Sequence, residues 1–133
     1  MKTKKVKVRA TTDDLGAVDF EVDGVKAKHS RLKLDKDSGP HSIDFELHDQ
    51  SGRGLMFQTD DPIWVGENVP CPPDPGVNSG QMSVTGCVPK TLSTLNHNSG
   101  DAREIRYQLN FVAADGSPLN CDPIIENGGG TAI

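Results

Sequence analysis

The sequence is 133 residues long, with 34% hydrophobic residues, 25% charged residues and a formal net charge of −5 at pH 7. This length suits one domain with a core that needs no cross-links, and the net acidity argues against a general nucleic-acid binder. No apolar run approaches the roughly 20 residues of a membrane-spanning helix. We therefore expect one domain over residues 1–126, followed by a flexible glycine-rich tail over residues 127–133.

The charge is unevenly distributed along the chain. Residues 1–35 carry nine Lys and Arg against six Asp and Glu, a net of +3. Residues 36–133 carry five against thirteen, a net of −8. Such a split predicts either attraction between the two parts within the fold or surfaces of opposite sign.

Residues 5–10 alternate charged and apolar side chains, which predicts a strand with one buried face. The exposed face would present Lys5, Lys7 and Arg9. Lysines on an edge strand discourage pairing with other chains, which is the simpler interpretation. The same basic row is also a candidate contact for an anionic partner.

A hairpin is predicted next. Val18, Phe20 and Val22 alternate with acidic residues, and the following Asp23-Gly24 pair suits a two-residue type I′ turn. If the first strand pairs with this hairpin, its basic side chains will face carboxylates. A change of phase further on predicts a bulge or break near His29 and Ser30.

Residues 43–47 alternate again and predict another strand. The stretch from Gly66 to Gly80 then contains four prolines, which lack the amide donor that a strand needs. This stretch is therefore expected to be a long loop, and loops of this length are usually functional or mobile.

The clearest pattern lies in residues 103–112, where Ile105, Tyr107, Leu109 and Phe111 occupy every second position. A helix would scatter these side chains, whereas a strand places them on one face. We expect a central strand, and the Asp115-Gly116 pair predicts a second hairpin returning beside it.

The pattern as a whole predicts an all-β fold without a convincing helix. We expect an antiparallel two-sheet sandwich of seven or eight strands, with immunoglobulin-like or cupredoxin-like connectivity.

The chain has three cysteines, Cys71, Cys87 and Cys121. An odd number favours reduced thiols in a cytoplasmic protein over a disulfide framework. One disulfide with one free thiol remains an alternative, as does an exported protein whose signal segment has been removed.

Metal sites have weak support in the sequence. No cysteine is followed closely by His or Met, as a blue-copper site would need, and neither Cys-x-x-Cys nor a close His pair indicates zinc. Asp60 and Asp61 lie in a predicted loop and are the candidate ligands for calcium, although acidic turn residues are also ordinary surface. We expect no cofactor.

Catalytic motifs are missing from the sequence. It contains neither a Gly-x-Ser-x-Gly elbow nor a phosphate-binding loop, and Cys71 has no basic residue close in sequence to activate it. The sequence therefore predicts a non-enzymatic protein.

Trp64 begins the proline-rich region and is a candidate anchor for a partner, with a core-plugging role as the alternative. Together these patterns predict a small interaction or assembly module. It would bind a protein partner or self-associate, through the loop from Trp64 to Gly80 or through the basic row. The alternatives are a metal-binding sandwich, with calcium ahead of zinc or copper, and a hydrolase whose site is assembled from distant residues.

Overall fold

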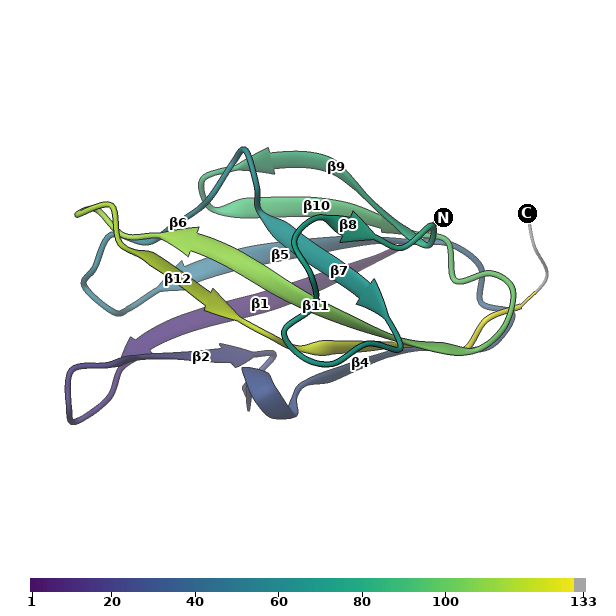
Figure 1. The fold of residues 1–133 in the computed structure, drawn as a ribbon, viewed down its shortest axis with the longest axis horizontal. Coiled ribbons are helices and arrows are strands. Elements are labelled where there is room, and N and C mark those ends of the chain that lie inside the picture. Colours follow the sequence, from purple (N-terminus) through teal and green to yellow (C-terminus); the bar gives the residue numbers. More distant parts are fainter. Residues whose placement is uncertain (131–133) are drawn as a thin grey trace.

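Two β-sheets lie face to face in the structure, a computed structural model that describes residues 1–130 (Figure 1). The first sheet has the spatial order β3 (Val25–Lys26), β2 (Val18–Val22), β1 (Lys2–Thr12), β5 (His41–Asp49), β10 (Thr91–Asn96) and β9 (Met82–Val88). The second sheet has the order β4 (Arg31–Leu34), β13 (Ile124–Asn127), β11 (Arg103–Val112), β7 (Ile63–Glu67) and β8 (Val77–Asn78), with β6 (Met56–Phe57) and β12 (Pro118–Cys121) also paired to β11. A 3-10 turn, η1 (Ala27–His29), links β3 to β4.

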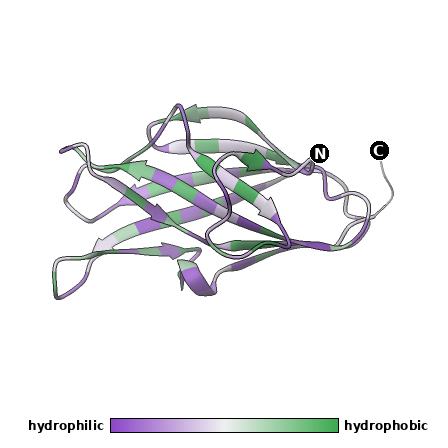
Figure 2. Ribbon diagram, viewed as in Figure 1, coloured by the Kyte–Doolittle hydropathy of each residue, from purple (hydrophilic) through white to green (hydrophobic). Residues whose placement is uncertain are grey.

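The predicted central strand is confirmed. β11 pairs with β7 and β13 along its first half and with β6 and β12 along its second half. Its four alternating side chains, Ile105, Tyr107, Leu109 and Phe111, are fully buried. Figure 2 shows the same alternation of hydrophobic and hydrophilic residues along this strand.

The core lies between the sheets and is joined by aromatic contacts across them. Phe20 of the first sheet stacks on Phe111 of the second, with ring centroids 5.0 Å apart. Phe45 and Tyr107 make a second contact at 5.4 Å. Aromatic pairs at this separation add to the burial of the apolar faces and hold the two layers together.

The purely antiparallel arrangement of seven or eight strands is corrected by the structure. Both sheets are mixed, because β1 runs parallel to β5, β13 to β4 and β7 to β8. The strands number thirteen over residues 1–130, and three of them have only two residues. Alternation identifies which residues share a face, but it carries no information on the direction of the neighbouring strand.

The hairpin prediction is confirmed. Asp23 and Gly24 have φ values of 50° and 82°, as a type I′ turn requires, and Val22 lies opposite Val25. The predicted break is also present, because η1 and Ser30 carry the chain from the first sheet to the second.

The flexible tail is corrected for residues 127–130. Asn127 is the buried last residue of β13, and the Gly128 N–H donates to the Leu34 carbonyl at 2.7 Å. Gly130 pairs with Gly100 in an isolated antiparallel bridge. The glycines serve close backbone approach rather than flexibility, a use that composition does not distinguish. The rest of the predicted tail, residues 131–133, lies outside the described residues.

Within residues 1–130, no helix has the length and apolarity needed to cross a membrane.

We expect Tyr107→Phe to leave the free energy of unfolding unchanged or to raise it by up to about 1 kcal/mol. The Tyr107 hydroxyl is buried and has no hydrogen-bond partner in the described part of the chain, so its removal relieves a desolvation cost. Urea denaturation of the two proteins measures the difference. A loss above about 1 kcal/mol would mean that the hydroxyl is bonded in solution.

Candidate functional site

The basic row of β1 lies between two acidic strands on the outer face of the first sheet. The Arg9 guanidinium is 2.6 Å from the Glu21 carboxylate of β2, and Lys5 Nζ is 4.0 Å from Glu46 of β5. Lys7 lies opposite Glu46 in the register of β1 and β5. The cross-strand pairing expected from the sequence therefore compensates much of the local positive charge.

Trp64 lies on the outer face of the second sheet, opposite in phase to the buried Ile63 and Val65. Its indole N–H donates to both carboxylate oxygens of Asp61, at 3.0 Å and 3.2 Å. Trp64 is half-buried and therefore does not plug the space between the sheets.

The candidate metal ligands Asp60 and Asp61 lie in the exposed turn before β7. Among residues 1–130, no group of three His, Cys, Asp or Glu side chains is placed to hold a metal ion. The Asp61 carboxylate is engaged by the indole of Trp64 instead. Calcium takes at least six oxygen ligands, so these two residues would need several further donors.

Cys71 lies in the proline-rich loop and is exposed, with its thiol 3.8 Å from the Asp122 carbonyl. Partial burial and the Asp122 carboxylate raise the pKa of Cys71, against a hydrogen bond from Arg106 that lowers it. A thiol with a raised pKa is mostly protonated at neutral pH and is a poor nucleophile. The geometry therefore gives Cys71 no catalytic activation.

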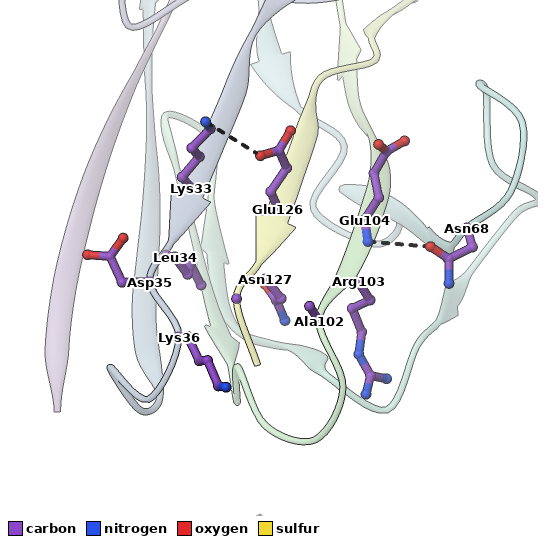
Figure 3. Close-up of a pocket in the computed structure, with 11 residues that line it drawn as sticks. Lys33, Leu34, Asp35, Lys36, Asn68, Ala102, Arg103, Glu104, Glu126 and Asn127 are labelled. Atoms are coloured by element: carbon purple, nitrogen blue, oxygen red, sulfur yellow. Dashed lines mark hydrogen bonds and ion pairs between the residues drawn. The ribbon is translucent and has the colours of Figure 1, made fainter. Parts of the chain in front are cut away.

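A surface hollow of about 540 Å³ lies beside Asn68, where β4 and β13 end and β11 begins (Figure 3). Two carboxylates on its wall are already paired. Glu126 lies 2.8 Å from Arg31 and 3.9 Å from Lys33, and Glu104 lies 2.7 Å from Arg106.

These ion pairs decide what the hollow can do chemically. Slight burial alone would raise the pKa of Glu104, but hydrogen bonds from Arg106 and Arg31 hold it below its usual value. A general acid needs the opposite shift. The hollow is therefore a charge-paired surface suited to polar contacts rather than to proton transfer.

Buried asparagines hold the end of the sandwich beside this hollow. The side chains of Asn96 and Asn127, 0% and 2% exposed, bond reciprocally at 2.9 Å and 2.8 Å. The Asn98 side chain donates to the Asp35 carbonyl at 2.9 Å and accepts from the Gly129 N–H at 3.0 Å. The network ties together the loops after β4 and β10 and the segment after β13.

This network was not predicted from the sequence, although the position of Asn96 in the sequence indicates a buried polar group. Leu92, Thr94 and Asn96 share the inward phase of β10, so a polar amide follows the apolar row into the interior. A polar residue at an inward position of a strand indicates either a buried hydrogen-bond partner or an error in the assigned phase.

Among residues 1–130, β9 is the longest edge strand of the two sheets and pairs only with β10. Val84 and Val88 on this strand are 40% and 57% exposed. A bulge at Thr85 offsets its two halves, because Ser93 lies opposite Gly86 while Thr94 lies opposite Val84. The sequence reasoning recognised the strand, but nothing in a single sequence indicates that it lies at an edge.

No protein-family model matches this chain, and no curated protein matches its sequence significantly.

Proposed function

We propose that this protein is a non-enzymatic assembly module that pairs with a second copy of itself along β9. The observation that supports the proposal is the edge of β9, where no side chain is charged and the outward backbone groups have no partner in the part of the chain that the structure describes. Exposed edges add strands from other chains unless charges, prolines or bulges block them. The bulge at Thr85 interrupts the edge of β9 at one position and adds no charge.

Two backbone hydrogen bonds show in which direction the free backbone groups of β9 point. The Leu47 N–H bonds to the Lys90 carbonyl, and the His97 N–H bonds to the Gln81 carbonyl. Because backbone groups alternate along an antiparallel ladder, Lys90 and the even positions of β10 face β5, and the odd positions face β9. Met82 and Cys87 of β9 lie opposite two even positions of β10, Asn96 and Leu92. Their N–H and C=O groups therefore point away from β10.

Three other open edges carry charges that oppose such pairing, and the uncharged edge strand β8 has only two residues. β3 ends at Lys26, and β4 contains Arg31 and Lys33. The first residues of β1, which β2 leaves unpaired, include three lysines, Lys2, Lys4 and Lys5. In contrast, residues 81–89 contain no charged side chain.

A second copy suits this edge because two neutral strands meet without repulsion. A two-fold axis brings the same stretch of both chains together in antiparallel order. The free groups of each strand then bond to those of the other. Val84 and Val88 would lose their exposure to water on pairing, which favours association.

Sedimentation equilibrium of the purified chain tests the proposal. We expect a concentration-dependent dimer that is weakened at least tenfold by Val84→Lys together with Val88→Lys, because each places an ammonium at the two-fold contact. Val25→Lys is the matched control, since Val25 is 46% exposed on the opposite edge of the same sheet. A chain that stays monomeric at all concentrations, or a control that dissociates the dimer equally, would overturn the proposal.

We further propose immunoglobulin-like or cupredoxin-like connectivity, which the two face-to-face sheets and their common core support. We also propose a reducing, cytoplasmic setting. Its support is that Cys71, Cys87 and Cys121 are unbridged in the structure.

A further inference from the structure

The inner face of the first sheet changes from apolar to cationic at one end of the sandwich. On β1, the buried row of Val6, Val8 and Ala10 continues in the same phase to Lys4 and Lys2. Beside it on β5, the buried row of Leu47, Phe45 and Ile43 ends at His41. Lys2 and Lys4, which also guard this edge of β1, therefore place two ammoniums beside His41 at the end of the inner face.

A hollow of about 420 Å³ lies over these residues, closed on its other side by the end of β4 and the loop that follows it. Lys2, Lys4 and His41 line it together with Asp35 and Ser38. Figure 3 shows the Asp35 carboxylate on the side of β1, whereas the ammonium of Lys33 is directed toward Glu126. The charges available to a ligand are therefore two ammoniums and one carboxylate.

His41 forms a buried polar surface of this hollow and is 3% exposed. Its Nδ1 lies 2.9 Å from the Gly39 carbonyl, which only accepts, so Nδ1 carries the proton. Nε2 is left with no hydrogen-bond partner among the described residues. Burial is the largest effect and lowers the pKa of His41, and the hydrogen bond to the Gly39 carbonyl opposes it in part. Lys2 and Lys4 lower the pKa further by smaller amounts, and Asp35 raises it slightly.

We infer that this hollow binds a tetrahedral oxyanion, a sulfate or a phosphate group, between Lys2, Lys4 and Nε2 of His41. With neutral His41, the two ammoniums and Asp35 leave a net charge of +1. A proton on Nε2 raises this to +2, which matches a dianion and supplies a third donor. The volume exceeds that of one oxyanion, so it also accommodates a small molecule that carries the group.

Binding is linked to proton uptake in a direction that the structure defines. The bound dianion stabilises the imidazolium, so the pKa of His41 is higher in the complex than in the free protein. Affinity therefore rises as pH falls from the pKa of the complex to that of the free protein, which lies below 6.5. At a pH above both pKa values, His41 is neutral in both states and the affinity no longer depends on its protonation.

NMR titration of the whole chain with sodium sulfate tests the inference, because sulfate remains a dianion from about pH 5 to about pH 8. Ionic strength is held constant with sodium chloride. We expect saturable shifts at the His41 ring and at the amides of residues 2–4 and Ser38, and an increase in the pKa of His41. An unchanged pKa of His41 in saturating sulfate would overturn the inference.

Variants separate a site from general charge screening. Lys2→Gln and Lys4→Gln should each weaken sulfate binding roughly two- to fivefold, since exposed charges contribute modestly. Asp35→Asn should strengthen binding, because it removes the one carboxylate of the hollow. Among residues 1–130 the Asp35 side chain has no hydrogen bond that the change would break, and the Asp35 carbonyl keeps its bond from Asn98. Lys28→Gln, on η1 and outside this hollow, is the matched control.

An equal loss in the Lys28→Gln control, or weaker binding by Asp35→Asn, would contradict the assignment. Titration with inorganic phosphate and with glucose 6-phosphate then tells a free ion from the phosphate group of a larger ligand. Saturable binding of either ligand at His41 supports the site. If neither ligand binds there, the proposal that the hollow takes a phosphate group is overturned.

Discussion

Gly128→Ala is expected to lower the free energy of unfolding by about 2 to 3 kcal/mol. A Cβ at this position would overlap the backbone of Lys36 and lie 2.7 Å from both the Asp35 carbonyl carbon and the Leu34 carbonyl oxygen. All three contacts are with main chain, which has no rotamer to relieve them. The Gly128 N–H also bonds to the Leu34 carbonyl, so a shift of the backbone would weaken that bond as well.

Gly80→Ala is the matched control, because a Cβ there meets nothing within 4 Å and its φ is not left-handed. Its expected effect is within about 0.5 kcal/mol of zero, with any gain arising from a less flexible unfolded chain. Urea denaturation measures both variants. If Gly128→Ala is as mild as Gly80→Ala, the segment after β13 is a loose tail and the packing described above is wrong.

Asn96→Ala and Asn127→Ala are each expected to cost about 2 to 3 kcal/mol. The two side chains are almost fully buried and satisfy one another, so truncation of either one leaves the remaining amide without its partner. Asn96 Oδ1 also accepts from the Asn98 N–H at 2.9 Å. Removal of Asn96 should therefore cost somewhat more than removal of Asn127.

A double-mutant cycle isolates the pair from the cavities that alanine creates. We expect the double variant to cost less than the sum of the single variants, with a coupling energy of about 1 to 2 kcal/mol. Ser93→Ala on the exposed face of β10 controls for changes to the strand itself. Additive costs would mean that the two amides do not depend on one another.

The strands in which apolar and polar side chains alternate over many residues were predictable from the sequence. β1, β5 and β11 were each recognised from side chains that change character at every second residue, and the buried rows of all three are as expected. Shorter segments carry too few residues for a period to be read. β6 and β8 therefore appear only in the structure.

The candidate site was less predictable, because its members come from segments far apart in the chain. Lys2, Asp35 and His41 meet only because β1 lies beside β5 and the end of β4 closes over both. In the sequence, Lys2 looks like any terminal lysine and His41 like any strand histidine. The residues singled out there, Trp64 and the basic row, instead bond to acidic neighbours on the outer faces of the sheets.

The sequence by itself determined which long segments form strands, which side of each of these strands is buried and where the Asp23-Gly24 turn reverses the chain. These features depend on local backbone geometry and on a period of two, both of which a few neighbouring residues specify. Only the tertiary structure decided that both sheets are mixed, that β9 is an open edge and that glycines after β13 pack against the β4–β5 loop. The physical reason is that strand order and close backbone contacts depend on which distant segments share a ladder, and side-chain periodicity is the same for every such choice.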